Sequence, residues 1–85
     1  MPEIFRESGY RFYFYSDDHE PIHIHVERGG CDAKFTLRGN KAELVYNYGL
    51  KPSEIKTATY LVEENIDKIV KHWIAYFGQK NNNNK

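Results

Sequence analysis

Three histidines, His19, His23 and His25, stand within seven residues of the segment DHEPIHIHVERGG, which spans residues 18–30. His23 and His25 alternate with apolar residues, so in a β-strand both imidazoles project from one face, with Cα atoms roughly 6.5 Å apart. Imidazoles at this spacing can bind one divalent cation. Because the pKa of histidine lies near neutrality, they can instead act as acid and base on a ribose hydroxyl or a leaving oxygen.

A metal site would need at least one further ligand beside His23 and His25. The loop at residues 16–21 offers Asp17, Asp18 and His19, and Glu43 lies two predicted strands away. We take Asp17 or His19 as the third ligand and a divalent cation such as zinc as the candidate cofactor. A histidine pair at this spacing is on its own a weak metal signal, so the reaction stays open.

The elements that must position these histidines are four predicted β-strands, at residues 10–15, 22–27, 31–37 and 41–46. Gly29-Gly30 and Gly39-Asn40 fit two-residue hairpin turns between the last three strands. With such turns Phe35 faces Ile24 on one side and Leu44 on the other, so that apolar residues meet apolar residues. A slip of one residue would turn every side chain to the opposite face, and the agreement therefore favours an antiparallel meander.

Residues 52–78 follow a helical period. Pro52 and Glu54 are typical of a helix start, and Gly78 is typical of a helix end. The apolar stripe consists of Ile55, Val62, Ile66, Ile69, Val70, Trp73 and Phe77. The period fits either one long helix or two helices joined near residues 64–65. Core packing is the favoured role of Trp73.

We therefore expect a single α+β domain at residues 1–78, with a four-stranded antiparallel sheet and this helical segment packed on one face. Residues 79–85 contain four consecutive asparagines and no apolar residue, which predicts a disordered tail.

Strand alternation assigns the side chains to two faces of the predicted sheet. The inward residues are Ile22, Ile24, Val26, Ala33, Phe35, Leu37, Ala42, Leu44 and Tyr46, joined by Phe12 and Phe14 if the first strand pairs with the second. The outward residues are Arg11, Tyr13, Tyr15, His23, His25, Lys34, Thr36, Glu43 and Val45. We expect the two strand histidines to lie on this wet surface, beside phenol rings and cationic side chains.

Glu27 and Asp32 would face each other across the first predicted hairpin, and like charges in this position repel. Arg28 or Lys34 would offset this repulsion, as would a bound cation. Otherwise the turn is not a two-residue turn.

The outward face has three interpretations: metal binding, RNA binding with or without cleavage, and non-catalytic packing or protein binding. In the RNA interpretation, Tyr13 and Tyr15 stack on unpaired bases while Arg11 and Lys34 hold phosphates. His23, His25 and His19 would then be the catalytic residues, with a cation offsetting phosphate charge in the transition state. Alternatively, the same tyrosines and cations contact a protein, since exposed aromatic residues are enriched at interfaces. Whether the protein is an enzyme stays open.

The composition excludes several other classes. The 85-residue chain has a formal net charge of zero, so broad electrostatic affinity for nucleic acid or an anionic membrane is not expected. No apolar run approaches the ~20 residues of a membrane helix, and the first residues do not resemble a signal peptide. The single cysteine, Cys31, excludes an internal disulfide and has inward parity, away from the histidines. We expect a cytoplasmic protein.

The segments MPEIFR, GYRFYFYS, DHEPIHIHVERGG and LVEENIDKIVKHWIAYFG resemble the small bacterial family called domain of unknown function 4160. The resemblance runs over residues 1 to about 78. Its most specific element is carried by Asp18, Glu20, Pro21, His23 and His25. The family often shows a second proline where this chain has isoleucine, at position 22, which alters the entry to the strand and leaves the histidines in place.

This resemblance implies a bacterial origin. Family members are commonly encoded beside a second small protein, an arrangement like that of toxin–antitoxin pairs. We therefore expect one member of such a pair, whose histidine- and tyrosine-rich face binds its protein partner or RNA. The alternative is a metal-binding or histidine-dependent phosphodiesterase of the ribonuclease type.

Overall fold

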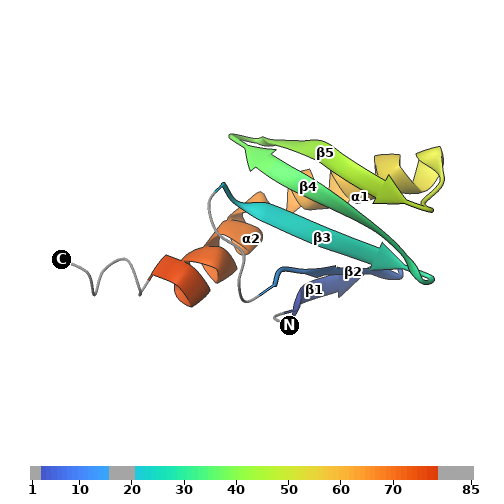
Figure 1. Cartoon of the computed structure of the whole chain (residues 1–85). Coiled ribbons are helices and arrows are strands. Elements are labelled where there is room, and N and C mark those ends of the chain that lie inside the picture. The colour runs from blue at the N-terminus through green and yellow to red at the C-terminus, as the bar shows by residue number, and fades with distance from the viewer. Residues whose placement is uncertain (1–2, 16–20, 79–85) are drawn as a thin grey trace.

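A computed structural model describes residues 3–15 and 21–78. Over these residues the chain forms one five-stranded antiparallel sheet in the order β1-β2-β3-β4-β5, followed by two helices and a π-helical turn (Figure 1). The elements are β1 (Glu3–Glu7), β2 (Tyr10–Tyr13), β3 (His23–Arg28), β4 (Cys31–Arg38), β5 (Lys41–Tyr48), α1 (Pro52–Glu64), α2 (Ile66–Trp73) and η1 (Ile74–Gly78). The α+β class and the antiparallel sheet are confirmed, but the predicted number of four strands is wrong.

The strand missing from the prediction is β1, which pairs antiparallel with β2. Ser8 and Gly9 connect the two strands, and both have positive φ angles, of 55° and 82°. Two left-handed residues match the twist of a tight hairpin. The Phe5 ring stacks on the Phe12 ring with centroids 4.3 Å apart, so β1 is held by packing that its charged sequence EIFRE does not reveal.

The predicted register of the central strands is confirmed. Ile24 lies opposite Phe35 across β3 and β4, and Phe35 lies opposite Leu44 across β4 and β5. Ile22 continues this pattern beyond β3, because its carbonyl accepts a 2.9 Å hydrogen bond from the Leu37 amide. The two glycine-containing turns therefore set which side chains share a face in β3, in β4 and in β5 as far as Leu44.

The alternation breaks at one point in β5. Lys34 pairs with Tyr46 while the next residue of β4 pairs with Leu44, so Val45 is an extra residue in a β-bulge. Beyond the bulge the two faces exchange. Tyr46 and Tyr48 therefore share the outward face with Lys34 and Asp32, and the prediction that Tyr46 points inward is wrong.

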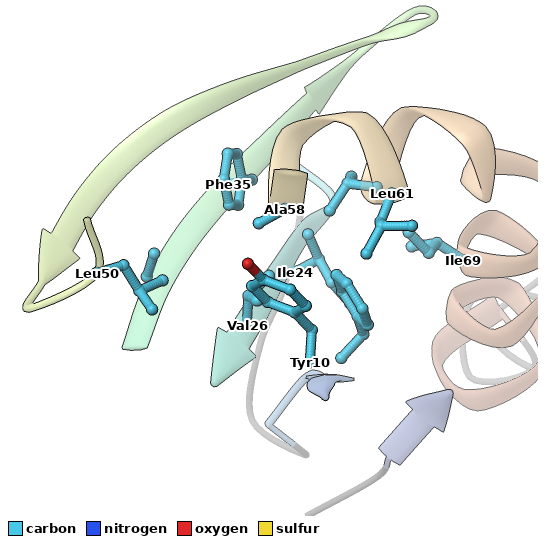
Figure 2. Close-up of a cluster of buried hydrophobic side chains, with 11 residues drawn as sticks. Tyr10, Ile24, Val26, Phe35, Leu50, Ala58, Leu61 and Ile69 are labelled. Carbon is cyan, nitrogen blue, oxygen red and sulfur yellow. The ribbon is translucent and has the colours of Figure 1, made fainter. Parts of the chain in front are cut away.

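The hydrophobic core lies between the sheet and the two helices (Figure 2). It consists of Tyr10, Phe12, Ile24, Val26, Ala33, Phe35, Leu50, Ala58, Leu61, Val62 and Ile69. Phe14 is also buried, as expected. Leu44 is a partial exception among the inward residues, because at the edge of the sheet it remains 46% exposed.

The helical segment consists of two helices because Asn65 interrupts it. Its side-chain amide donates a 2.8 Å hydrogen bond to the Leu61 carbonyl, and its own backbone N–H bonds to the Val62 carbonyl at 3.1 Å. With φ −117° and ψ 22°, Asn65 leaves the helical conformation, and α2 starts at the next residue. In the part of the chain that the structure describes, neither helix is long and apolar enough to cross a membrane. The predicted tail at residues 79–85 lies outside the described residues.

The start of α1 is tied to the sheet through Glu54. Its carboxylate accepts a 2.8 Å hydrogen bond from the Lys51 backbone N–H and forms a 2.8 Å ion pair with Arg28 at the end of β3. These two contacts lower the pKa of the Glu54 carboxyl below its usual value. Arg28 therefore links the first glycine turn to the helix layer.

Candidate functional site

The two strand histidines lie side by side on the outward face, as predicted. Their ring centroids are 6.3 Å apart and the rings are nearly perpendicular, at 82°. Tyr13 lies opposite His25 on β2 and stacks on its ring at 5.4 Å, and Tyr15 meets the same ring edge-on at 4.5 Å. We call Tyr13, Tyr15, His23 and His25 the histidine cluster.

The expectation that these imidazoles lie on a wet surface is wrong. His25 is only 4% exposed and His23 only 9%. The two tyrosines lie against His25, and Trp73 at the end of α2 contacts His23, with ring centroids 5.8 Å apart. A buried imidazole cannot reach a dissolved phosphodiester without a rearrangement of these rings, so the arrangement does not favour acid–base catalysis.

Trp73 packs within the fold, as predicted, and is 2% exposed. Its ring also meets Phe14 at 5.5 Å and Phe77 at 4.4 Å. Trp73 therefore joins the helices to both faces of the sheet, because Phe14 is an inward residue and His23 an outward one.

Tyr13 is buried as well, in contrast to the exposed stacking surface predicted for it. Burial, followed by hydrogen bonding with Tyr15, raises the pKa of the Tyr13 hydroxyl. Tyr15 is 42% exposed, so one ring of the predicted tyrosine pair remains accessible.

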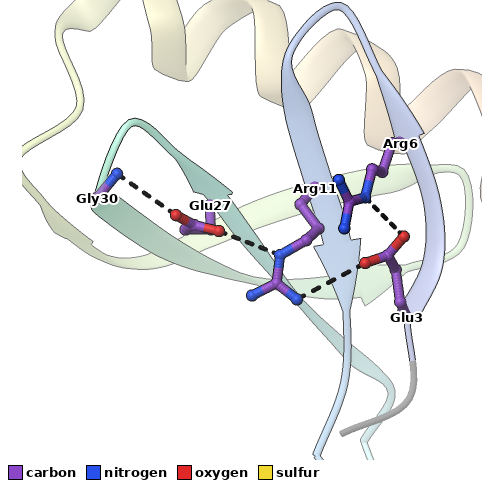
Figure 3. Close-up of polar contacts among 5 residues, drawn as sticks. All are labelled: Glu3, Arg6, Arg11, Glu27 and Gly30. Carbon is purple, nitrogen blue, oxygen red and sulfur yellow. Dashed lines mark hydrogen bonds and ion pairs between the residues drawn. The ribbon is translucent and has the colours of Figure 1, made fainter.

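Arg11 is engaged in ion pairs. Its Nε lies 3.1 Å from Glu27 Oε1 and its Nη1 lies 3.7 Å from Glu3 Oε1, while the guanidinium lies 4.5 Å over the Tyr13 ring (Figure 3). Glu27 and Asp32 face each other as the register predicts. The charge that offsets their repulsion is Arg11 of β2, rather than the predicted Arg28 or Lys34.

Lys34 lies between His25 and Tyr46 in the cross-strand row, half-buried. Among the described residues it forms no ion pair, in contrast to Arg11.

The residues described provide no group of three side chains that could hold a metal ion. Glu43, one proposed further ligand, forms a 2.8 Å ion pair with Arg38. Asp17, Asp18 and His19 lie outside the described residues, so their roles as ligands or catalysts stay predictions. Cys31 is half-buried against the core and away from the histidines, as expected.

β5 carries an exposed aromatic surface that strand alternation does not predict. The Tyr46 and Tyr48 rings stack at 4.7 Å, Tyr48 is 66% exposed and the bulge residue Val45 is 52% exposed. We call Val45, Tyr46 and Tyr48 the β5 patch. Simple alternation splits these residues between two faces, and only the bulge brings both tyrosines to the outward one.

The fold and the site define a small α+β domain with an internal histidine pair and an exposed aromatic edge strand. The family model "Domain of unknown function (DUF4160)" matches residues 9–74, and the chain belongs to this family. The matched region runs from the turn before β2 to just beyond Trp73, and so includes the histidine cluster and its tryptophan cover. No curated protein and no solved structure matches the chain.

Proposed function

We propose that this protein is a non-catalytic binding protein that pairs with a second small bacterial protein, in a toxin–antitoxin-like arrangement, and contacts it through the β5 patch. The observation that carries the proposal is the difference in exposure between the histidine cluster and the β5 patch. The histidine cluster is mostly inside the fold, whereas Tyr48 and Val45 are more than half exposed.

The chemistry of the β5 patch suits a protein partner. Interfaces are enriched in tyrosine, and their binding energy is concentrated in a few such residues. β5 is an edge strand of the described sheet. Its Ala42 amide already donates a 2.9 Å hydrogen bond to Glu63 of α1, which occupies one edge donor. We therefore expect docking through side chains of the patch rather than through addition of a strand along all of β5.

The test is titration calorimetry of the full chain with the purified protein encoded beside it. Tyr48→Ser is expected to weaken binding roughly tenfold or more, as loss of a central interface tyrosine does. Tyr60→Ser is the matched control, because Tyr60 is 60% exposed on α1 and outside the patch. It should leave the affinity unchanged.

Two results would contradict the proposal: no association between the two proteins, or equal affinities for wild type and Tyr48→Ser. A single-stranded RNA is titrated in parallel. Binding that depends on Tyr48 with RNA, but not with the protein, would favour the RNA interpretation of this face instead.

A further inference from the structure

A cleft of about 440 Å³ lies at the end of the sheet that carries the β1–β2 and β3–β4 turns. Its lining includes the two turn glycines Gly9 and Gly29 and three arginines, Arg6, Arg11 and Arg28. We propose that this cleft binds the phosphate group of a hydroxyl-bearing phosphate ester, such as a ribose phosphate.

The lining carries three guanidinium groups, each already ion-paired with a carboxylate and each with further N–H donors. Glu27 is the only acidic residue among the described lining residues. Arg6 bonds to Glu3 through Nε at 2.8 Å, and Arg28 bonds to its helix partner through a single Nη. A guanidinium carries five N–H donors, so each of these arginines keeps donors for a ligand.

The arginines are held in place before any ligand arrives. Figure 3 shows Arg6 and Arg11 on paired strands, with Glu3 bonded to both and Glu27 bonded to Arg11. Arg28 is fixed from two other sides. Its guanidinium lies 5.1 Å from the centre of the Tyr10 ring and pairs with a carboxylate of α1. Positioned side chains lose less entropy on binding than mobile ones.

Gly9 permits this arrangement. A Cβ at this position would lie 3.4 Å from Arg28 Nε, in van der Waals contact, so the turn backbone approaches the arginine closely. The backbone there has φ +82°, which also favours glycine. The close approach brings the β1–β2 turn against the Arg28 side chain and closes this side of the cleft.

The arginines and the carboxylate of the lining together favour a ligand that carries both a phosphate and a hydroxyl group. Guanidinium groups bind phosphate through paired, charge-assisted hydrogen bonds. The Glu27 carboxylate would repel a bare anion, but it can accept a hydrogen bond from a ligand hydroxyl. A phosphate ester of a sugar satisfies both groups, and the volume lies within the roughly 300–1,000 Å³ of typical ligand pockets.

This inference does not depend on the proposed partner binding. The partner contact is proposed for the β5 patch, and none of the three patch residues is among the described residues that line the cleft. Tyr48→Ser should therefore leave ribose phosphate binding intact, and loss of the cleft arginines should leave β5 patch residues in place.

The test is an NMR titration of the ¹⁵N-labelled full chain with ribose 5-phosphate, with ribose as the uncharged control. Saturable shifts are expected at the Gly9 and Gly29 amides, and none at Gly39, which lies in the other hairpin turn. Arg28→Gln should weaken binding roughly tenfold or more, because charge-assisted hydrogen bonds are lost. Arg38→Gln is the matched control, since Arg38 is ion-paired with Glu43 outside the cleft.

Arg28→Lys, which keeps the charge but not the paired donors, should give an intermediate affinity. A short single-stranded RNA identifies the source of the phosphate: affinity that rises with RNA length indicates a nucleic-acid backbone, and affinity equal to that of ribose 5-phosphate indicates a small ester. The inference is overturned if ribose 5-phosphate produces no saturable shift at the two glycines, or if Arg38→Gln weakens binding as much as Arg28→Gln.

Discussion

Replacement of Trp73 by alanine is expected to lower the free energy of unfolding by about 3–5 kcal/mol, as for other buried aromatic residues. The side chain is 2% exposed and contacts Phe14, Phe77 and His23. Its loss removes the contact between the end of α2 and both faces of the sheet. Because small domains are stable by only about 5–15 kcal/mol in total, this change should bring the protein close to unfolding at moderate temperature.

Urea denaturation followed by circular dichroism measures this loss. Ile74→Ala is the control, since Ile74 is the next residue and is 57% exposed. It should change stability by less than about 0.5 kcal/mol, as surface substitutions usually do. Equal effects of the two substitutions would mean that Trp73 does not anchor the helices.

Gly49→Ala is expected to lower the free energy of unfolding by about 2–5 kcal/mol, from backbone strain and overpacking together. Gly49 has φ +103°, and a Cβ there would lie 2.6 Å from Cys31 Sγ and 3.2 Å from Cys31 Cβ. The turn after β5 therefore packs closely against Cys31 at the start of β4. A methyl group added at Gly49 must displace either this turn or the Cys31 side chain.

Gly39→Ala separates the cost of backbone strain from the cost of overpacking in Gly49→Ala. Gly39 also has a positive φ, of 59°, but nothing lies within 4 Å of the Cβ position. Its replacement should cost only about 1–2 kcal/mol, the strain of a left-handed residue. Adding Cys31→Ala to Gly49→Ala should recover part of the loss, because the nearest contact disappears. Equal costs at the two glycines, without recovery, would contradict the predicted clash.

The sequence predicts the central sheet well because the register depends on local features. Two-residue turns and strict alternation are sufficient to pair Ile24 with Phe35 and Phe35 with Leu44, as the structure confirms. β1 was missed because its short, charged sequence has no pattern of its own. It is held by the hairpin turn at Ser8 and Gly9 and by packing on β2.

The candidate site is less predictable because its character comes from tertiary contacts. Alternation places His23 and His25 on the outward face, but it cannot show that Trp73, more than forty residues away, covers one of them. Nor does alternation show the bulge at Val45, because nothing in the sequence of β5 marks the extra residue that shifts its pairing with β4. The burial of the histidines and the exposure of Tyr48 both follow from these non-local features.

His23 and His25 are internal to the fold, which leaves partner binding to the exposed β5 patch. Modification by diethyl pyrocarbonate, followed by mass spectrometry, measures whether these imidazoles are accessible. His72 is exposed on α2 and serves as the internal reference. We expect His72 to react roughly tenfold or more faster than His23 and His25, whose modification needs a local opening of the structure. Modification of all three at the same rate would contradict the burial of His23 and His25 and would make them candidate catalysts again.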